Sequence, residues 1–438
     1  TILASKPDVN AVDANKSTPL MYGIMYRKQP ATVVERLIAA GADINQRNRS
    51  GQTALHIACY HNRPNIAKAL VKAGADMNAK DNNSNSAFFA ACQSCPEAMP
   101  DMLAKGADVL AVNRQQQNAL HLACMSGRLK NVKLVLEHVK DVNQADKSGQ
   151  TALVIAVGQQ NKEIVKLLLS KGANTNLPSK NQYSHPPICR SAINGSLEIM
   201  QELVNAKADV NVKGYEGNRA IHLAILSAGQ VHNSMRGNDT PAAKKSLDRY
   251  AKMVKLLLDN GADANLKNDQ GLTPMKLAVS SNFAPAVELL VDSTKELNFD
   301  VGQGTLIHWT AENGLTKTAK RLFADGQTDI NAVNGDGRTA LQLAAANGHA
   351  KMIDYLIAQQ ANLETPDPNG MTPLMLAADK GDANSLAALL EAGADATKRV
   401  DGGQSALHFA AWSGDAATIK TLMTKITDAN IATDSGYT

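Results

Sequence analysis

One short phrase recurs along the chain at an almost constant interval, and this periodicity limits the folds that are open to it. The phrase reads Thr-Ala-Leu-His-Ile-Ala where it begins at Thr53. Ten of its eleven steps span 32 to 35 residues, and one spans 54. A unit of this length cannot bury its own apolar face, so neighbouring units must stack. The phrase and its equivalents begin at Thr18, Thr53, Ser86, Asn118, Thr151, Pro186, Arg219, Thr273, Thr305, Thr339, Thr372 and Ser405.

Each unit has the same internal order, which the unit around Thr151 illustrates. Residues 146–149 predict a polar turn whose glycine supplies a left-handed conformation, and Thr151 is placed to cap the helix that follows. Residues 152–157 predict a short apolar helix, and residues 163–170 predict a second helix with four aliphatic side chains on one side. Gly172 then ends the second helix. Turn, helix, helix and loop repeat, which predicts an all-α repeat solenoid.

The repeat resembles that of the ankyrin repeat family, whose signature phrase is Thr-Pro-Leu-His-x-Ala at a 33-residue period. Pro274 and Pro373 keep the proline of that phrase, and the loop phrase Gly-Ala-Asp-x-Asn stands at residues 41–45, 74–78 and 261–265. The resemblance covers the whole chain. It implies an inner and an outer layer of helices, with short β-hairpin fingers projecting from one edge. The histidine of the phrase is kept at His56, His121, His222, His308 and His408.

We expect a single solenoid over residues 1–438. Residues 1–12 read as the tail of an earlier unit, and the residues from 434 onward read as the opening of a further one. Neither end has the polar character of a capping repeat, so we expect the chain to be a window in a longer array. The repeats are expected to start near residues 13, 48, 81, 113, 146, 181, 214, 268, 300, 334, 367 and 400.

The step of 54 residues places an insertion at residues 227–250, within the seventh repeat. Thr240 and Pro241 predict the cap and the first residue of a helix that runs to Asp259. Two interpretations stay open: a tolerated surface insertion, or a mildly basic element that docks a partner. A loop is predicted in the first part of the insertion by Gly229, His232, Asn233, Gly237 and Asn238.

Charge is distributed unevenly along the chain, although its formal net charge is only +4. Residues 1–250 carry 30 Lys and Arg against 19 Asp and Glu, a net charge of +11, and residues 251–438 carry 15 against 22, a net charge of −7. An extended molecule with a basic and an acidic part has a field that orients charged partners. Aromatic residues make up only 4% of the chain, and no nucleic-acid recognition motif appears, so nucleic acid is not the expected partner.

The chain contains no run of 18 apolar residues, so no membrane span is expected. Five cysteines, an odd number, do not suit a disulfide framework, and we expect a reducing compartment, the cytoplasm. Cys92 and Cys95 have the spacing of a metal or redox pair. However, Cys92 stands one residue past the helix alanine, as Cys59 and Cys124 do, so we interpret it as a packing residue.

Residue types that serve catalysis do not converge. The repeat histidines occur once per unit, and in the resembled family this histidine has a structural role in the turn region. No phosphate-binding loop, nucleophile elbow or kinase signature occurs, and acidic residues stand singly rather than in pairs suited to acid–base work. We therefore expect no enzyme activity, no metal, no cofactor and no small-molecule substrate.

The expected finger tips carry a positive charge on seven consecutive units. One interpretation is that these cations are simply solvated. The other is a basic surface for a protein partner that is acidic or phosphorylated. Later tips carry Asp336, Asp367 and Asp401. The cations are Arg47, Arg49, Lys80, Arg114, Lys147, Lys180, Lys213 and Lys267.

The resemblance implies that partners meet the concave face of the solenoid, which is built from the finger tips and from the variable residues after the helix alanine. Large apolar and aromatic side chains at such positions are typical of binding hot spots. At the ends of the first helices, the candidates are Tyr26, Tyr60, His61, Met125 and Trp412. At the finger tips, they are Tyr183 and Tyr215.

These expectations together favour a protein-interaction scaffold or adaptor that is part of a longer protein. Two alternatives from other classes stay open. One is the cytoplasmic repeat domain of an ion channel, as in transient-receptor-potential channels. The other is a targeting module attached to an enzyme or a microbial effector. Because repeat folds host many unrelated partners, the repeats do not separate these classes.

Overall fold

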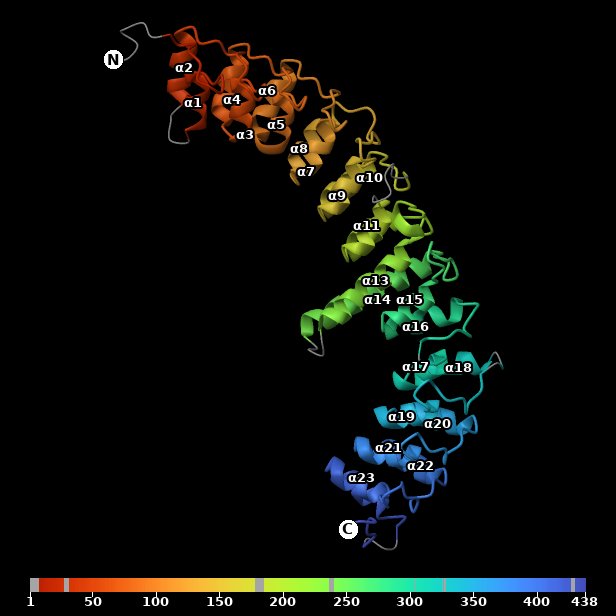
Figure 1. The fold of residues 1–438 in the computed structure, drawn as a ribbon. Coiled ribbons are helices and arrows are strands. Elements are labelled where there is room, and N and C mark those ends of the chain that lie inside the picture. The colour runs from red at the N-terminus through yellow and green to blue at the C-terminus, as the bar shows by residue number, and fades with distance from the viewer. Residues whose placement is uncertain are drawn as a thin grey trace. The chain divides into compact units, whose positions relative to one another are not determined.

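Helices in pairs, joined by short loops, make up almost all of the regular structure (Figure 1). They belong to two compact units, Thr1–Leu223 (unit 1) and Ala224–Thr438 (unit 2). The boundary between the units falls within one helix, α13 (Ala220–Met235). The residues described by this computed structural model are 8–26, 31–177, 185–235, 240–302, 304–324, 326, 328–426 and 430–438.

Unit 1 contains two layers of helices. The first helix of each pair packs against the first helix of the next pair, and the second helices form a layer behind them. The first helices are α1 (Pro19–Met25), α3 (Ala54–Tyr60), α5 (Ala87–Ser94), α7 (Ala119–Met125), α9 (Ala152–Gly158) and α11 (Pro187–Ile193). The second helices are α2 (Ala31–Ala39), α4 (Pro64–Lys72), α6 (Met99–Ala104), α8 (Leu129–Leu136), α10 (Lys162–Ser170) and α12 (Leu197–Asn205).

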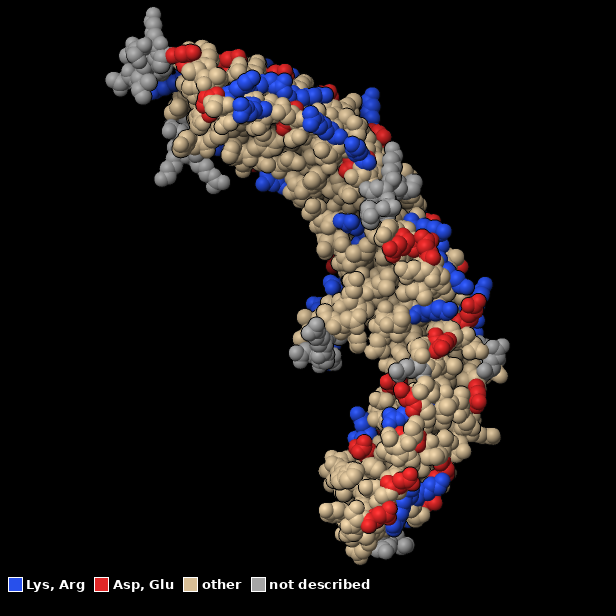
Figure 2. All heavy atoms as spheres, in the orientation of Figure 1, with Lys and Arg blue, Asp and Glu red and all other residues tan. Residues whose placement is uncertain are grey.

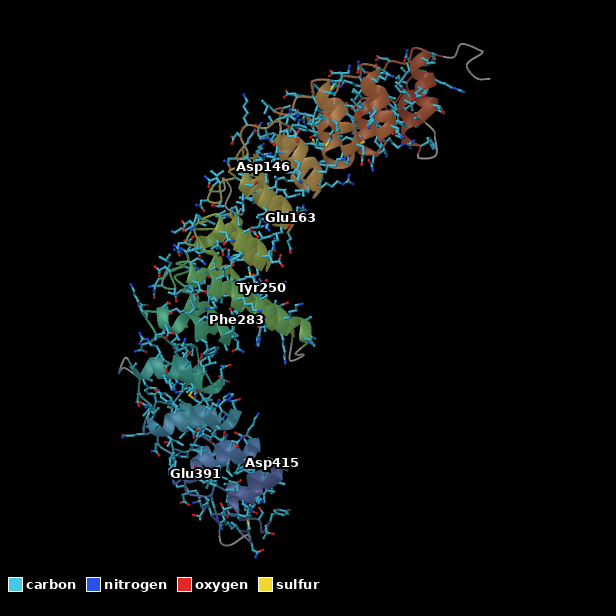
Figure 3. All side chains as sticks on the ribbon, turned by 180° about the vertical axis from the view of Figure 1, so that it is seen from behind. Asp146, Glu163, Tyr250, Phe283, Glu391 and Asp415 are labelled. Carbon is cyan, nitrogen blue, oxygen red and sulfur yellow. The ribbon has the colours of Figure 1, made fainter. Side chains whose placement is uncertain are left out.

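Unit 2 repeats the two-layer arrangement after α13. Its core includes Tyr250 and Phe283, which are both buried and whose side chains Figure 3 labels. The first helices are α15 (Pro274–Ser280), α17 (Leu306–Glu312), α19 (Ala340–Asn347), α21 (Pro373–Lys380) and α23 (Ala406–Ser413). The second helices are α14 (Pro241–Asp259), α16 (Ala284–Leu290), α18 (Thr316–Ala324), α20 (Ala350–Ala358), α22 (Ala383–Glu391) and α24 (Ala416–Leu422).

The repeated phrase starts each first helix and also fills the core. Thr151 precedes α9, and its side-chain oxygen accepts the backbone N–H of Val154 at 3.4 Å, which satisfies one of the free donors at the helix start. The third residue of the phrase is large and buried, as Leu153 is, and the sixth is small, most often alanine, as Ala156 is. Alanine lets neighbouring helices approach closely, which explains how a chain with few aromatic residues builds a continuous core.

The fingers are simpler than the expected β-hairpins. The described residues contain isolated antiparallel bridges, such as the one between Ala145 and Thr151, and no longer strand. The fingers lack longer strands because each finger is a compact turn, which an acidic or amide side chain closes with hydrogen bonds. Asp146 (labelled in Figure 3) accepts the backbone N–H groups of Ser148 at 2.8 Å and Gln150 at 2.9 Å. With Gly149 at a φ of +80°, the chain reverses within four residues and leaves room for one bridge.

Adjacent repeats are joined by hydrogen bonds outside the helices. The backbone N–H of Lys147 donates to the carbonyl of Gln115 in the preceding finger at 2.8 Å. In the loop phrase, Asn78 donates to the carbonyl of Gly106 at 3.1 Å and accepts the N–H of Asp108 at 2.8 Å. The final asparagine of Gly-Ala-Asp-x-Asn therefore connects one repeat to the next, which gives this loop residue a structural role.

The insertion consists of two extended helices. As predicted, α14 begins at Pro241, with the Thr240 side chain accepting the N–H of Ala243 at 3.2 Å, and it ends at Asp259. The predicted loop is wrong at Gly229, His232 and Asn233, because α13 continues through them to Met235. Gly237 and Asn238 lie outside the described residues. Tertiary contacts stabilise the extension. Gly229 is buried against Ser281, and the ring of His232 lies 3.2 Å from the amide nitrogen of Asn282.

Gly229 should be intolerant of even one added methyl group. A Cβ at this position would lie 2.7 Å from the Cβ of Ser281, too close for any real contact. We expect Gly229→Ala to lower the free energy of unfolding by about 1–2 kcal/mol, because overpacking outweighs the gain in helix propensity. Thermal unfolding of the chain measures it. The double variant with Ser281→Gly should recover the loss, and an undiminished Tm in the single variant would show that the packing is loose.

Candidate protein-binding surface

The first helices of unit 1 present two sets of side chains that the position within the phrase defines. The helix-end column holds the residue seven places after each phrase start, and the central row holds the residue four places after it. In α3 to α11 the helix-end column is Tyr60, Gln93, Met125, Gly158 and Ile193. In the same helices the central row is Ile57, Ala90, Leu122, Ile155 and Arg190.

The helix-end column contains exposed apolar side chains. Met125 is 43% exposed and Ile193 is 37% exposed, while Tyr60 is half-buried. Burial raises the pKa of the Tyr60 hydroxyl to about 12, so it remains a neutral group that can donate a hydrogen bond. In the first repeat Tyr26 caps α1 and is 65% exposed, and His61 caps α3 and is exposed. These residues offer apolar surface to a partner.

Most of the predicted finger cations in unit 1 are exposed. Arg49, Arg114 and Lys147 lie in the turns with exposed side chains, and Lys213 is exposed just before the turn of the seventh finger. Figure 2 shows Lys and Arg side chains gathered over the part of unit 1 that runs from α4 to α8. The turns also space these cations regularly, because the N–H groups of Arg49, Arg114 and Lys147 each donate to a carbonyl of the preceding finger.

Arg47 has a structural role that its place at a tip did not predict. Its Nε donates to the carbonyl of Gly51 at 3.0 Å within the same turn, and its Nη2 donates to the carbonyl of Lys80 in the next finger. The guanidinium therefore connects two fingers. A partner would have to displace these bonds to bind Arg47, so we leave it out of the charge-reversal test below.

The aromatic candidates at the finger tips differ in their placement. Tyr215 begins a 3-10 turn (Tyr215–Gly217) and is half-buried, with its ring packed edge-on against His185 at 6.3 Å between centroids. Tyr183 and Lys180 lie outside the described residues. Tyr215 thus contributes to packing between the sixth and seventh repeats as well as to the surface of unit 1.

Trp412 is the most exposed of the predicted aromatic residues that the structure describes, and it belongs to unit 2. It lies near the end of α23, is 68% exposed, and packs edge-on against Phe409 with centroids 5.5 Å apart. A cavity of about 710 Å³ adjoins it, lined also by Leu407, His408 and Tyr437. Trp412 therefore marks a second apolar surface, on a different unit from the helix-end column.

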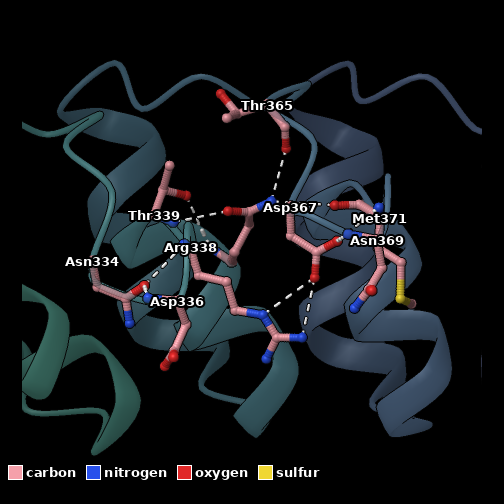
Figure 4. Close-up of polar contacts among 9 residues, drawn as sticks. Asn334, Asp336, Arg338, Thr339, Thr365, Asp367, Asn369 and Met371 are labelled. Atoms are coloured by element: carbon pink, nitrogen blue, oxygen red, sulfur yellow. Dashed lines mark hydrogen bonds and ion pairs between the residues drawn. The ribbon is translucent and has the colours of Figure 1, made fainter. Parts of the chain in front are cut away.

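The acidic residue at one later tip is buried, not presented to a partner. Asp367 has no exposed side-chain surface. Its Oδ2 accepts Nε and Nη2 of Arg338 at 3.2 Å and 3.1 Å, and its Oδ1 accepts the N–H groups of Asn369 and Met371 (Figure 4). This contact occupies both charged groups, so neither is available as a binding charge without loss of the turn.

Three of the repeat histidines, His56, His121 and His308, form hydrogen bonds to the next repeat. The Nδ1 of His56 accepts the N–H of Thr53 at 3.2 Å, and its Nε2 lies 3.1 Å from the carbonyl of Asn85 in the next repeat. Burial lowers the pKa of His56, and it lowers the pKa of His121 in the same way. These side chains are neutral structural elements, in line with the role that the resemblance implies.

All five cysteines are free and buried. The thiol of Cys59 hydrogen-bonds to that of Cys95, which raises the pKa of Cys59 well above its usual range, and burial raises the pKa of Cys92. The described residues contain no cluster of three or more His, Cys, Asp or Glu side chains that could hold a metal ion. No helix among them is long and apolar enough to cross a membrane.

Sequence comparisons agree with this geometry. A family model for ankyrin repeats (3 copies) matches residues 1–81, 87–179, 241–334 and 307–400. The chain is 27% identical over 190 residues to a transient receptor potential cation channel subfamily A member 1 homolog of Caenorhabditis elegans, which is 40% of this chain and 15% of that protein. It is 25% identical over 194 residues to the nuclear factor NF-kappa-B p105 subunit of Gallus gallus, which is 43% of this chain and 18% of that protein.

The chain therefore spans less than a fifth of the length of these two curated relatives. The matches to the family model cover most of the chain in both units. They coincide with paired helices, with capped phrase starts and with the loop hydrogen bonds between repeats. The chain belongs to the ankyrin repeat family.

Proposed function

We propose that the chain is a protein-interaction module, a scaffold or adaptor, that binds its partner on the first helices and fingers of unit 1. Ankyrin repeats are protein-binding modules, and a single observation supports this site among the surfaces described. The exposed apolar side chains of Met125 and Ile193 lie on the same run of repeats as the exposed cations Arg114, Lys147 and Lys213. Apolar anchors beside cations are typical of binding hot spots.

The charge of unit 1 supports an acidic or phosphorylated partner. The backbone N–H groups of Arg49, Arg114 and Lys147 donate to the preceding finger, so the turns that carry these cations are ordered before a partner binds. Charges at the rim of an interface mainly raise the association rate and choose the partner. The five buried thiols support a reducing compartment such as the cytoplasm.

Charge reversal of the exposed finger cations tests the proposal. The variant Arg49→Glu, Arg114→Glu, Lys147→Glu and Lys213→Glu should bind a captured acidic partner at least tenfold more weakly, with the loss mainly in the association rate. Surface plasmon resonance at low and high salt measures it, because screening weakens such contacts. Partners from lysate supply the ligand, and each is then purified before measurement.

A matched control reverses four exposed lysines on the second helices of the same unit. Lys72→Glu, Lys105→Glu, Lys133→Glu and Lys171→Glu produce the same change of net charge away from the fingers. This control should retain binding, and both variants should unfold near the temperature of the wild type. Equal losses in the two variants would mean that net charge alone attracts the partner and that the fingers do not form the site.

The similarity to a cation channel homolog supports a second proposal, that the repeats are the cytoplasmic domain of an ion channel. The match to the p105 subunit has almost the same identity and extent, so the comparisons do not favour the channel over other classes. A targeting module attached to an enzyme or a microbial effector is the third class. The sequence of the full transcript tests these proposals: several apolar spans beyond residue 438 would favour the channel, and a catalytic motif would favour the third class.

A further inference from the structure

Arg190 interrupts the central row of unit 1. Ile57, Leu122 and Ile155 stand at this position in other repeats, and each is at most 8% exposed. The sixth repeat has an arginine there, on α11, between the buried side chains of Ile188 and Ser191. A charged side chain in a row that is aliphatic from α3 to α9 is costly to bury, and so it needs a physical reason.

Gly158 leaves open the space into which Arg190 extends. A Cβ built on Gly158 would lie 3.5 Å from Nη2 of Arg190 and 3.6 Å from its Nε, which is ordinary contact distance. The guanidinium thus lies over the end of α9, where the helix-end column has no side chain. The neighbours in that column, Met125 and Ile193, are apolar and exposed. The result is a positive group between two apolar side chains.

One donor of the Arg190 guanidinium is not satisfied within the described part of the chain. Its Nε is buried and has no hydrogen-bond partner, and no acidic side chain among the described residues pairs with it. The neighbouring ring of His185 offers no negative charge. The pKa of His185 is lowered by burial and then by the charge of Arg190. A buried donor without an acceptor is rare in native proteins and calls for one.

We propose that Arg190 is an anchor for a carboxylate side chain of the partner, with apolar side chains of the same partner segment on Met125 and Ile193. This inference rests on the proposed function and names the chemistry that unit 1 selects. An arginine presents a planar fork of donors that matches a carboxylate. Burial and the charge of Arg190 both lower the pKa of His185, so His185 adds no positive charge near pH 7. The single charge of the guanidinium balances one carboxylate better than a doubly charged phosphate.

Selection of random twelve-residue peptides displayed on yeast, with the intact chain as bait, tests this inference. Peptides enriched on the wild type should carry Asp or Glu at one fixed position with apolar residues on both sides. Arg190→Met should bind these peptides at least tenfold more weakly, while Arg128→Met, the same change at an exposed position of unit 1, should leave their affinity unchanged. A second selection on Arg190→Glu should enrich Lys or Arg at the same position.

Arg190→Met should fold, because it restores an apolar side chain to an apolar row, and its Tm should equal or exceed that of the wild type. Enriched peptides without an acidic preference, or equal affinity for Arg190→Met, would overturn the inference. A synthetic peptide with phosphoserine at the acidic position should bind more weakly than its Glu counterpart; tighter binding would overturn the assignment to a carboxylate.

The variant Met125→Glu separates failure of this inference from failure of the proposed function. If selected peptides lose affinity for Met125→Glu but not for Arg190→Met, the surface binds partners and only the role of Arg190 falls. If their affinity changes in neither variant, or if no peptide is enriched, the proposed surface and the anchor fall together.

Discussion

Asp367→Ala is expected to lower the free energy of unfolding of the surrounding repeats by about 2–4 kcal/mol, because the change leaves several buried partners unsatisfied. The Oδ1 of Asp367 accepts the N–H groups of Asn369 at 2.9 Å and Met371 at 3.0 Å, and its Oδ2 accepts two donors of Arg338. The side chain has no exposed surface. Water therefore cannot replace the lost acceptor without opening the turn.

Two control variants separate the contribution of the turn hydrogen bonds to this loss from the contribution of the ion pair. Asp367→Asn keeps an oxygen for the backbone N–H groups, as Asn334 does at the same position of the preceding finger, and loses the charge. It should cost less than the alanine variant. Arg338→Met removes the counter-ion and leaves the buried carboxylate unpaired, so it should also be destabilising.

Hydrogen exchange read by mass spectrometry resolves the effect in the intact chain. Repeat arrays unfold locally, so a single unfolding midpoint for the whole molecule would average the effect over repeats that the variant does not touch. Peptides around residues 334–371 should exchange faster in Asp367→Ala, and peptides of unit 1 should not. If none of the three variants exchanged faster than the wild type in these peptides, neither the turn nor the ion pair would stabilise this part of unit 2.

Local signals in the sequence predict the start of α14, and they fail for the end of α13. The start of α14 depends on Thr240 and Pro241, which act within one turn of the helix. The continuation of α13 depends on Ser281, about 50 residues away, against which Gly229 packs. A glycine is read as a loop signal when only its neighbours in sequence are considered. The contact of Gly229 with Ser281, in another repeat, instead keeps this glycine within the helix.

The finger residues show a second limit of prediction from the local sequence. The period predicts that Arg47, Arg114 and Asp367 stand in turns, and they do. It does not predict the direction of a side chain. The Arg47 guanidinium donates to two backbone carbonyls, and Asp367 is buried beneath Arg338. Of the three, only Arg114 has an exposed side chain and a bond to the neighbouring, preceding finger that involves the backbone alone.

Arg190 could have been found from the sequence by comparing the same position across repeats. Aligned by the phrase start, the central row reads Ile57, Ala90, Leu122, Ile155 and then Arg190. An arginine in an aliphatic position is a visible departure. Its consequence was not visible, because the space beside it comes from Gly158 in the preceding repeat, and the lack of a partner for Nε depends on the packed structure.

The phrase histidines His56 and His121 are expected to make the free energy of unfolding of unit 1 sensitive to acid. Burial lowers the pKa of His56 and His121 below the usual value of about 6.5. The unfolded chain therefore binds protons more readily than the folded chain between the lowered pKa values and about pH 6.5. By linkage, the contribution of these two histidines to the free energy of unfolding is constant above this window. As the pH drops through the window, that free energy falls by at most about 1.4 kcal/mol per pH unit for each histidine.

Gln342 supplies a control that does not titrate. It stands at the histidine position of its own phrase, where its Oε1 accepts the N–H of Thr339 at 2.8 Å and its Nε2 donates to the carbonyl of Met371 at 3.2 Å. These are the two bonds that His56 forms. Glutamine at the histidine positions should therefore preserve the structure near neutral pH and remove the proton uptake.

The double variant His56→Gln and His121→Gln should match the wild type at pH 7.5 and be more stable than it at pH 5. Hydrogen exchange of unit 1 peptides, or Tm measured from pH 7.5 to 5, compares the two slopes. A smaller slope should persist in the variant, because burial also lowers the pKa of His185. Parallel curves would show that other groups govern the acid sensitivity. A variant already weaker at pH 7.5 would show that imidazole geometry, beyond its two hydrogen bonds, is needed at the joint between repeats.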